Sequence, residues 1–459
     1  MQDTPGIVDE AGAAEPINIT FENRGDRLIG LGFVNAFLKI ITLGLYSFWG
    51  KTEVRRRLWS FTRLNGEPLE YTGTGKELFL GFLIVFFAIL LPVFLSGFAV
   101  TALFGKNAVV IFQLCVYVLF FFLLGNAMYR AQRYRLSRTR WRGIRGILTG
   151  SPQRYGWTYF WTIAAPFLAA ALIAGVAARL TKPAVGGVLV ILGLIAGLWV
   201  LPWRANRLQG MMTNDMRFGD GSLSYTGSPG PLYKRYLYAW GGSALLLIMA
   251  ATATILVLIR SGIAKSLTDL GHFPDFSKLP PGDPMTRAVA LATITIAAIW
   301  ILTMILAGVI TAWYRANQMN HFARNTSFQN ARFRLQATGP SLVWLTISNW
   351  LLGFLGLLAG ASLGFALAAI TGVLHPLPTV PSQPYVAIAL SVLPSVTFAL
   401  PIILTTGITA TFAQFRSTRY FMSRLKLDGP INLQQVLQGQ DQGLRRGEGL
   451  AQVFDLDAF

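Results

Sequence analysis

The amino-acid sequence predicts an all-α polytopic membrane protein built from tandem transmembrane hairpins, on three observations. Apolar residues make up 53% of the 459 residues and charged residues only 13%, about half the charged share of a soluble domain. No acidic residue occurs between Glu77 and Asp215, or between Asp283 and Asp428. Long apolar runs recur along the chain, and a run of about 20 such residues spans a bilayer as a helix.

Eight runs have the length and composition of strong membrane-spanning helices. They lie near residues 78–104, 108–128, 157–180, 184–203, 237–260, 287–313, 341–370 and 385–413, and they pair into four hairpins. A weaker N-terminal run at 28–48 contains Asn35 and Lys39. This ninth run either re-enters the membrane or lies at its interface, or else it spans the membrane and places the N-terminus in the periplasm. Its modest length and Lys39 favour the first alternative.

Three parts of the chain differ in composition. Residues 1–18 are acidic, small and Pro-containing, which predicts a flexible N-terminal tail; they lack the basic start and apolar stretch of a signal peptide. Residues 19–430 form the predicted membrane domain. Residues 431–459 are the predicted cytoplasmic C-terminal tail.

The distribution of cations predicts the orientation. Of the 39 Lys and Arg residues, about 29 lie between hairpins and about seven in the loops inside them, and cytoplasmic loops carry the excess of Lys and Arg. The segments between hairpins and the C-terminus are therefore expected in the cytoplasm. The net charge of +19 is also typical of nucleic-acid binding. Because the cations lie between apolar runs, we predict anionic membrane lipids as partners and no nucleic acid.

A basic motif recurs where each hairpin ends. It reads "YRAQR" (129–133), "WRANR" (203–207), "YRANQ" (314–318) and "FRSTR" (415–419), with "WGKTE" (49–53) as a weaker first copy. After each motif comes a polar stretch that ends in glycine, such as "LEYTGTGKEL" and "FRLQATGPSL". The two-residue alternation there predicts short cytoplasmic strands, and the glycine a turn into the next helix. This recurrence indicates tandem duplication.

The stretch "NAFLKIITLGLYSFWGKTEVRRRLW", followed by "LEYTGTGKELFLGF", resembles the opening of the YjgN-like bacterial inner-membrane family, a domain family of unknown function. The C-terminal "GEGLAQVFDLDAF" is similar to that family's tail. The resemblance covers essentially the whole chain, and "TLGLYSFW" is its most specific block. It implies a bacterial inner-membrane location. It implies no activity and supplies no catalytic residue.

The arginines of the basic motif, here called the exit arginines, are the candidate site. Positions i and i+3 of a helix share a face, so two paired arginines could each donate two hydrogen bonds to a phosphate. The alternative is that they only set topology and attract anionic lipid loosely. The amide or hydroxyl between them could cap a helix or bond a neighbouring strand. The candidate residues for headgroup or anion binding are Arg130, Arg133, Arg204, Arg207, Arg315, Arg416 and Arg419.

Other chemistry has little support in the sequence. The three histidines are scattered without ligand spacing, the strong runs hold no carboxylate of the kind that coupled transporters use, and no catalytic arrangement is recognisable. We therefore expect no enzyme, no metal and no cofactor. Cys115 is interpreted as a small core residue, and Gly356, Gly360 and Gly364 as a ridge for close helix packing within the protein.

Two functions remain open from the sequence. The first is transport or binding of a lipid-like or small anionic molecule. The second is a non-transporting scaffold that acts through the cytoplasmic strands and the C-terminal tail.

Overall fold

The computed structural model describes residues 17–22, 25–180, 185, 187–188, 193, 197–263, 284–371 and 384–431. The helices are α1 (Asp26–Ile41), α2 (Ser47–Phe61), α3 (Gly75–Val85), the π-helical segment η1 (Phe86–Leu90), α4 (Leu91–Arg138), α5 (Pro152–Leu180), α7 (Leu201–Asn214), α8 (Gly230–Arg260), α10 (Pro284–Arg324), α11 (Gly339–Ile370) and α12 (Pro384–Met422). The predicted tails fall almost entirely outside the described residues.

The strands are all short. They are β1 (Ile19–Phe21), β2 (Thr62–Leu64), β3 (Glu67–Pro68), β4 (Glu70–Tyr71), β5 (Thr139–Trp141), β6 (Ile144–Leu148), β7 (Met216–Phe218), β8 (Gly221–Tyr225), β9 (Thr326–Phe328), β10 (Ala331–Leu335) and β11 (Leu425–Asp428). Two compact units contain these elements. The first comprises Met1–Ser228, Asn320–Gln336 and Ser348–Phe459, and includes every strand; the second comprises Pro229–Met319 and Ala337–Ile347.

Within the described residues, seven helices are long and apolar enough to cross a membrane, which confirms an all-α polytopic membrane protein. They are Gly75–Gly105, Asn107–Arg138, Pro152–Ile173, Gly230–Arg260, Thr286–Arg324, Gly339–Ile370 and Leu393–Met422. Each coincides with a predicted strong run. The eighth run, 184–203, is described only in part. Its described Gly193 and Gly197 approach Ala170 and Pro166 of α5, as the return half of a hairpin would.

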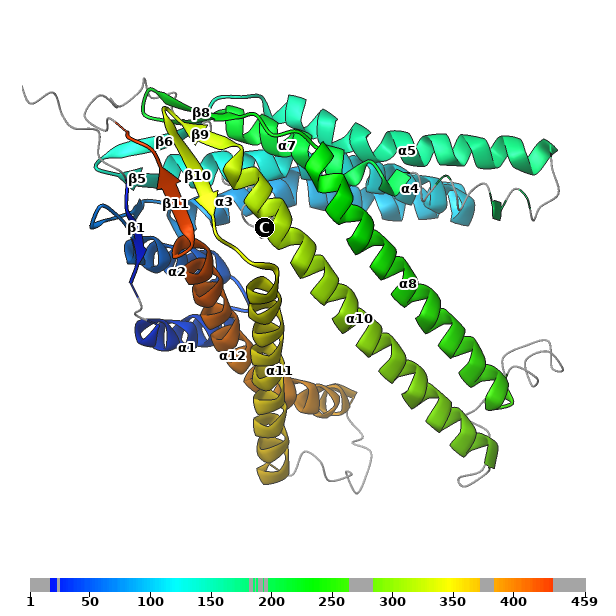
Figure 1. The fold of residues 1–459 in the computed structure, drawn as a ribbon. Coiled ribbons are helices and arrows are strands. Elements are labelled where there is room, and N and C mark those ends of the chain that lie inside the picture. Colours follow the sequence, from blue (N-terminus) through cyan, green and yellow to red (C-terminus); the bar gives the residue numbers. More distant parts are fainter. Residues whose placement is uncertain are drawn as a thin grey trace, which may run out of the picture. The chain divides into compact units, whose positions relative to one another are not determined.

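The strands of the first unit form one eight-stranded sheet and one three-stranded sheet. The larger sheet has the order β11-β10-β9-β8-β7-β6-β5-β4, and the smaller one β1-β2-β3. All pairs are antiparallel. In Figure 1 the arrows β8, β9, β10 and β11 lie together. Neighbours in this order are thus also neighbours along the chain.

The strand pairing fixes where each hairpin begins and ends. The strand before a helical hairpin pairs with the strand after it: β4 with β5, β6 with β7, β8 with β9, and β10 with β11. The chain therefore leaves the sheet, makes a hairpin and returns beside its starting point. In the first hairpin the reversal is at Gly105, whose φ is +74°. Each hairpin from α3 onward consequently starts and ends at this one sheet.

The weak N-terminal run follows the same rule. It forms α1, and the chain reverses at Leu43 and Gly44, both with positive φ. Strand β1 before α1 pairs with β2 after α2, with Ile19 opposite Leu64. The side-chain amide of Asn35 donates to the carbonyl of Gly50 across the two helices at 3.4 Å. The chain therefore starts and ends this helical pair at β1 and β2, which puts these two strands on the same side.

Helix α12 is packed on two faces in the first unit. On one face it meets α11, where a Cβ added to Gly356 would lie 2.6 Å from Thr409 and one added to Gly360 would lie 2.5 Å from the Cα of Ile402. On its other face, Gly407 abuts Ala36 of α1. Figure 1 shows α1 beside α12. The predicted glycine ridge is therefore confirmed as internal packing between α11 and α12.

Strand alternation divides the larger sheet into two faces. One face is apolar, and Phe328, Ala331, Leu427 and Ile431 form a buried cluster there. Side chains from β6, β7, β8 and β10 and Ile17 pack against this cluster. The exit helices cover part of the same face, since Tyr129 of α4 and Leu208 of α7 are buried with Leu148 of β6. The opposite face carries the polar side chains.

One local prediction is wrong. Cys115 is exposed on the Asn107–Arg138 span rather than buried in a core. A single small apolar side chain carries no information about which face of a membrane helix it occupies, because lipid-facing and core-facing positions are both apolar.

Candidate functional site

The exit motifs lie where membrane helices reach the sheet. Their small third residue is explained by packing, because Ala131 and Ala316 are each only 1% exposed. The preceding aromatic residue varies in role. Tyr129 and Phe415 are buried, whereas Trp203 is 42% exposed, as suits an indole in the headgroup layer.

Arg133, Arg204 and Arg416 are candidate arginines that contact groups of the protein itself. The guanidinium of Arg133 donates to the carbonyl of Gly150. That of Arg204 donates to Thr162 Oγ1 at 3.1 Å and lies 4.1 Å from the ring centre of Tyr159. That of Arg416 donates to Ser348 Oγ at 2.6 Å. Arg204 and Arg416 thus hold the exit helix to the preceding helix of the same hairpin, and Arg133 holds α4 to the loop before α5.

The other four candidates are more open to solvent. Arg207, Arg315 and Arg419 are exposed and Arg130 is half-buried. Arg204 and Arg207 therefore do not point at one shared phosphate site. Arg204 stacks on Tyr159, whereas Arg207 is exposed. The i, i+3 spacing places two Cα atoms on one face, but the side chains then follow their separate partners.

The polar residue inside the motif has a structural role in the WRANR copy. Asn206 is buried; its Oδ1 accepts from the hydroxyl of Tyr225 at 2.6 Å, and its Nδ2 donates to the carbonyl of Gly227 at 2.9 Å. Only glycine fits at 227, since an added Cβ would lie 2.2 Å from that hydroxyl. Burial raises the pKa of Tyr225 to about 12. The amide therefore bonds the neighbouring strand, one of the two roles expected.

Two carboxylates belong to the same region and sequence reasoning missed their role. Glu77 accepts from the hydroxyl of Tyr134 at 2.6 Å and from Arg138 at 2.7 Å. Asp215 accepts from the hydroxyl of Tyr129 at 2.8 Å. The sequence signal that could have indicated this role was their position, because Glu77 and Asp215 are the acids at the two ends of the first long acid-free stretch. They fasten the end of α4 to the segments before and after it.

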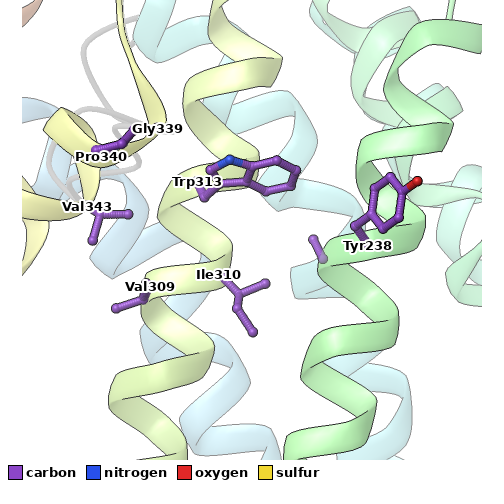
Figure 2. A pocket seen from close by; sticks show the side chains of 8 residues that line it. Tyr238, Val309, Ile310, Trp313, Gly339, Pro340 and Val343 are labelled. Atoms are coloured by element: carbon purple, nitrogen blue, oxygen red, sulfur yellow. The ribbon is translucent and has the colours of Figure 1, made fainter.

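The second unit contains an apolar pocket with a volume of about 450 Å³. Helices α8, α10 and the beginning of α11 form it (Figure 2). Its lining residues are Tyr238, Ala239, Val309, Ile310, Trp313, Gly339, Pro340 and Val343. Figure 2 shows Trp313 and Tyr238 on facing helices. The volume is within the usual range of small-molecule sites.

Cations lie close to this pocket along α8. Lys234 precedes Tyr238 by one helical turn and Arg235 precedes it by three residues, so both are on its side of the helix. Lys234 is exposed and Arg235 half-buried. Within the part of the chain that the structure describes, no group of three or more His, Cys, Asp or Glu could hold a metal ion.

Comparison with known proteins places this architecture in a family. Residues 16–453 match the family described as "Bacterial protein of unknown function (DUF898)". The chain belongs to this family. Two relatives are both named "Inner membrane protein YjgN". The one from Salmonella typhimurium is 27% identical over 183 residues, and the one from Escherichia coli K12 is 34% identical over 79 residues.

The matched segments are partial. The first covers 39% of this chain and 43% of the Salmonella protein, and the second covers 17% and 20% of the two chains. No solved structure matches this family member. The names of the relatives and the apolar helices together identify an inner membrane protein of unknown function.

Proposed function

We propose that this protein binds a lipid-like anionic molecule at the cytoplasmic headgroup level of the bacterial inner membrane. The observation that carries the proposal is the apolar pocket of the second unit, with Lys234 on the same side of α8 as Tyr238. An apolar tail fits the lining side chains, and an anionic group fits Lys234 and Arg235. Tyr238 and Trp313 are aromatic types that favour this depth.

The exposed exit arginines extend the proposal. Arg207 and Arg315 are exposed at helix ends, where each cation near an anionic membrane contributes about 1 kcal/mol. They attract and hold headgroups, whereas the inward arginines position the helices. The proposed orientation puts the sheet and the C-terminus in the cytoplasm. It follows from the excess of Lys and Arg in the segments between the hairpins, which contain the strands of the sheet. Their recurring form supports an origin by tandem duplication.

Native mass spectrometry of the purified protein tests the pocket. Val309→Trp fills it, and we expect a several-fold loss of retained anionic lipid or amphiphile. Ile301→Phe is the matched control, because Ile301 is on the same helix and 55% exposed. Lys234→Gln should lower retention of anionic lipids more than that of zwitterionic lipids. Equal retention by Val309→Trp and Ile301→Phe would eliminate this site.

Transport of the bound molecule is the further step of this proposal. A fluorescent anionic lipid introduced into one leaflet of proteoliposomes measures it. Protein-dependent appearance of the lipid in the other leaflet, reduced by Val309→Trp, would support transport. Retention without such movement would limit the function to binding.

A scaffold is the second candidate, and one observation favours it. The strands form a continuous eight-stranded sheet with an exposed polar face. Such a face offers a large surface for a partner protein. Affinity purification that returns the same stoichiometric partner from wild type and from Val309→Trp would favour the scaffold over lipid binding.

A further inference from the structure

The polar face of the eight-stranded sheet is strongly basic. Residues opposite each other in register share a face, and so do residues two apart in a strand. These rules place six cations and two carboxylates on this face, a net charge of four positive. The cations are Arg140, Arg145, Arg217, Arg332, Arg334 and Lys426, and the acids are Glu70 and Asp428.

Like charges lie directly opposite one another at two places on this basic face. Arg140 is opposite Arg145 in the β5–β6 pair, and Arg334 is opposite Lys426 in the β10–β11 pair. Such cross-strand pairs destabilise a sheet. Each of these pairs has one acid beside it: the carboxylate of Asp428 lies 3.1 Å from Nε of Arg334, and Glu70 is opposite Arg140 in the β4–β5 pair. The face keeps an excess of four positive charges, which would attract a further anionic group.

The bilayer does not fit as that anion. The exit helices pack on the opposite, apolar face of the sheet, so the basic face is directed away from the helix ends. Single-stranded nucleic acid fits poorly too, because the register puts no aromatic side chain on this face for bases to stack on. An acidic peptide segment is the better match.

The chain itself contains such a segment. Residues 1–16 carry Asp3, Asp9, Glu10 and Glu15, and the first cation of the chain after them is Arg24. The segment joins the described structure at Ile17, which packs with Leu427 of β11 and its apolar neighbours. Ile17 lies on the apolar side of β10 and β11, and β11 is the end strand of the sheet; the segment would pass the edge of β11 to reach Arg332, Arg334 and Lys426.

The reach of the segment is sufficient. Asp3 and Ile17 are 14 residues apart, and a random-coil linker of that length has a root-mean-square end-to-end distance of about 20 Å. Four strands span about 19 Å. A tethered segment of this length has an effective concentration of about millimolar, so even weak charge pairing would keep it on the face.

We propose that the acidic segment 3–15 occupies the basic face of the eight-stranded sheet in the same molecule and competes with acidic partners for it. The proposal does not depend on the lipid pocket. The two sites are on different elements and are tested by different probes, so one can fail while the other holds.

Fluorescence anisotropy with the full-length protein and a labelled peptide of residues 1–16 tests this proposal. In one variant the segment is neutralised by Asp3→Asn, Asp9→Asn, Glu10→Gln and Glu15→Gln. We expect this variant to bind the added peptide at least tenfold more tightly than wild type, because its own segment no longer competes. Raising the salt concentration should weaken that binding.

The binding surface is tested in the neutralised variant. Adding Arg217→Gln and Arg332→Gln should lower peptide affinity at least tenfold. Adding Arg57→Gln and Arg154→Gln, two exposed arginines outside the sheet, removes the same charge and should change it less than threefold. Equal affinity of wild type and the neutralised variant, or no peptide binding by either, would refute occupation by the segment. Equal effects of the two arginine pairs would refute the surface.

Discussion

Replacing Gly360 by alanine should weaken the packing of α11 on α12. The added Cβ would lie 2.5 Å from the Cα of Ile402 and 2.5 Å from Thr405 Oγ1. Carbon atoms in good contact are about 3.5–4.0 Å apart, so the helices must separate locally by about 1 Å. Because the obstacle is backbone, no rotamer change relieves it. Overpacking of this kind costs about 1–3 kcal/mol.

Gly353 supplies the matched control on the same helix. No atom lies within 4 Å of the Cβ that would be added there. Alanine is favoured over glycine inside a helix by roughly 0.5–1 kcal/mol, and both substitutions gain this term. Gly353→Ala should therefore be as stable as wild type or more stable. Gly360→Ala should be destabilised by about 0.5–2 kcal/mol after the gain is subtracted from the packing cost.

The free energy of unfolding in mixed micelles, measured by titration with a denaturing detergent, checks this difference. Light scattering of the folded variants should give the wild-type mass, because the ridge packs inside the molecule. If the two alanine variants had equal stability, the close approach of α11 and α12 would be wrong. A change of oligomeric mass in Gly360→Ala alone would assign the ridge to dimerisation instead.

Three further results are expected from the exit region. Arg204→Lys should destabilise the protein, because lysine loses the planar stack on Tyr159 and the fork geometry, whereas Arg207→Lys should leave the unfolding temperature unchanged. Asn206→Ala should lower the free energy of unfolding by about 1–3 kcal/mol, because it leaves the buried hydroxyl of Tyr225 without its acceptor. A larger loss of stability in Tyr225→Phe than in Asn206→Ala would contradict this. The raised pKa of Tyr225 means that the folded state favours the neutral phenol. The contribution of this phenol to stability is complete below the pKa of the unfolded state, about 10, and is lost as the pH rises towards about 12. Ultraviolet titration of wild type and Tyr225→Phe would detect this ionisation.

The membrane helices could be predicted from sequence because the bilayer imposes a length and an apolar composition that few other structures share. The strands that precede the helices were also found, since Leu223 and Tyr225 in β8, or Phe333 and Leu335 in β10, alternate with polar residues. Their partners β2, β5, β7 and β9 were not predicted. Each has three residues, too few for an alternating pattern.

The membrane side of the N-terminal segment could not be assigned from its own residues. Lys39 and a modest length left two alternatives, and the pairing of β1 with β2 favours a re-entrant or interfacial helix over a spanning one. For the candidate site, the positions of the arginines were evident but their directions were not. Arg204 turns to Tyr159, which is 45 residues earlier in the chain, and such long-range partners follow from packing rather than from local spacing.

The measurement that tests the account most directly is the membrane side of β1. Thr20→Cys in β1 and Ser224→Cys in β8 both place an exposed cysteine on a strand, and Ser261→Cys is at the opposite end of α8. The background needs Cys115→Ser, since the native cysteine is exposed. In spheroplasts, a membrane-impermeant maleimide should label only Ser261→Cys, and Thr20→Cys and Ser224→Cys should react only after lysis. Labelling of Thr20→Cys from the periplasm would mean that α1 spans the membrane, and it would contradict the placement of all strands on one side.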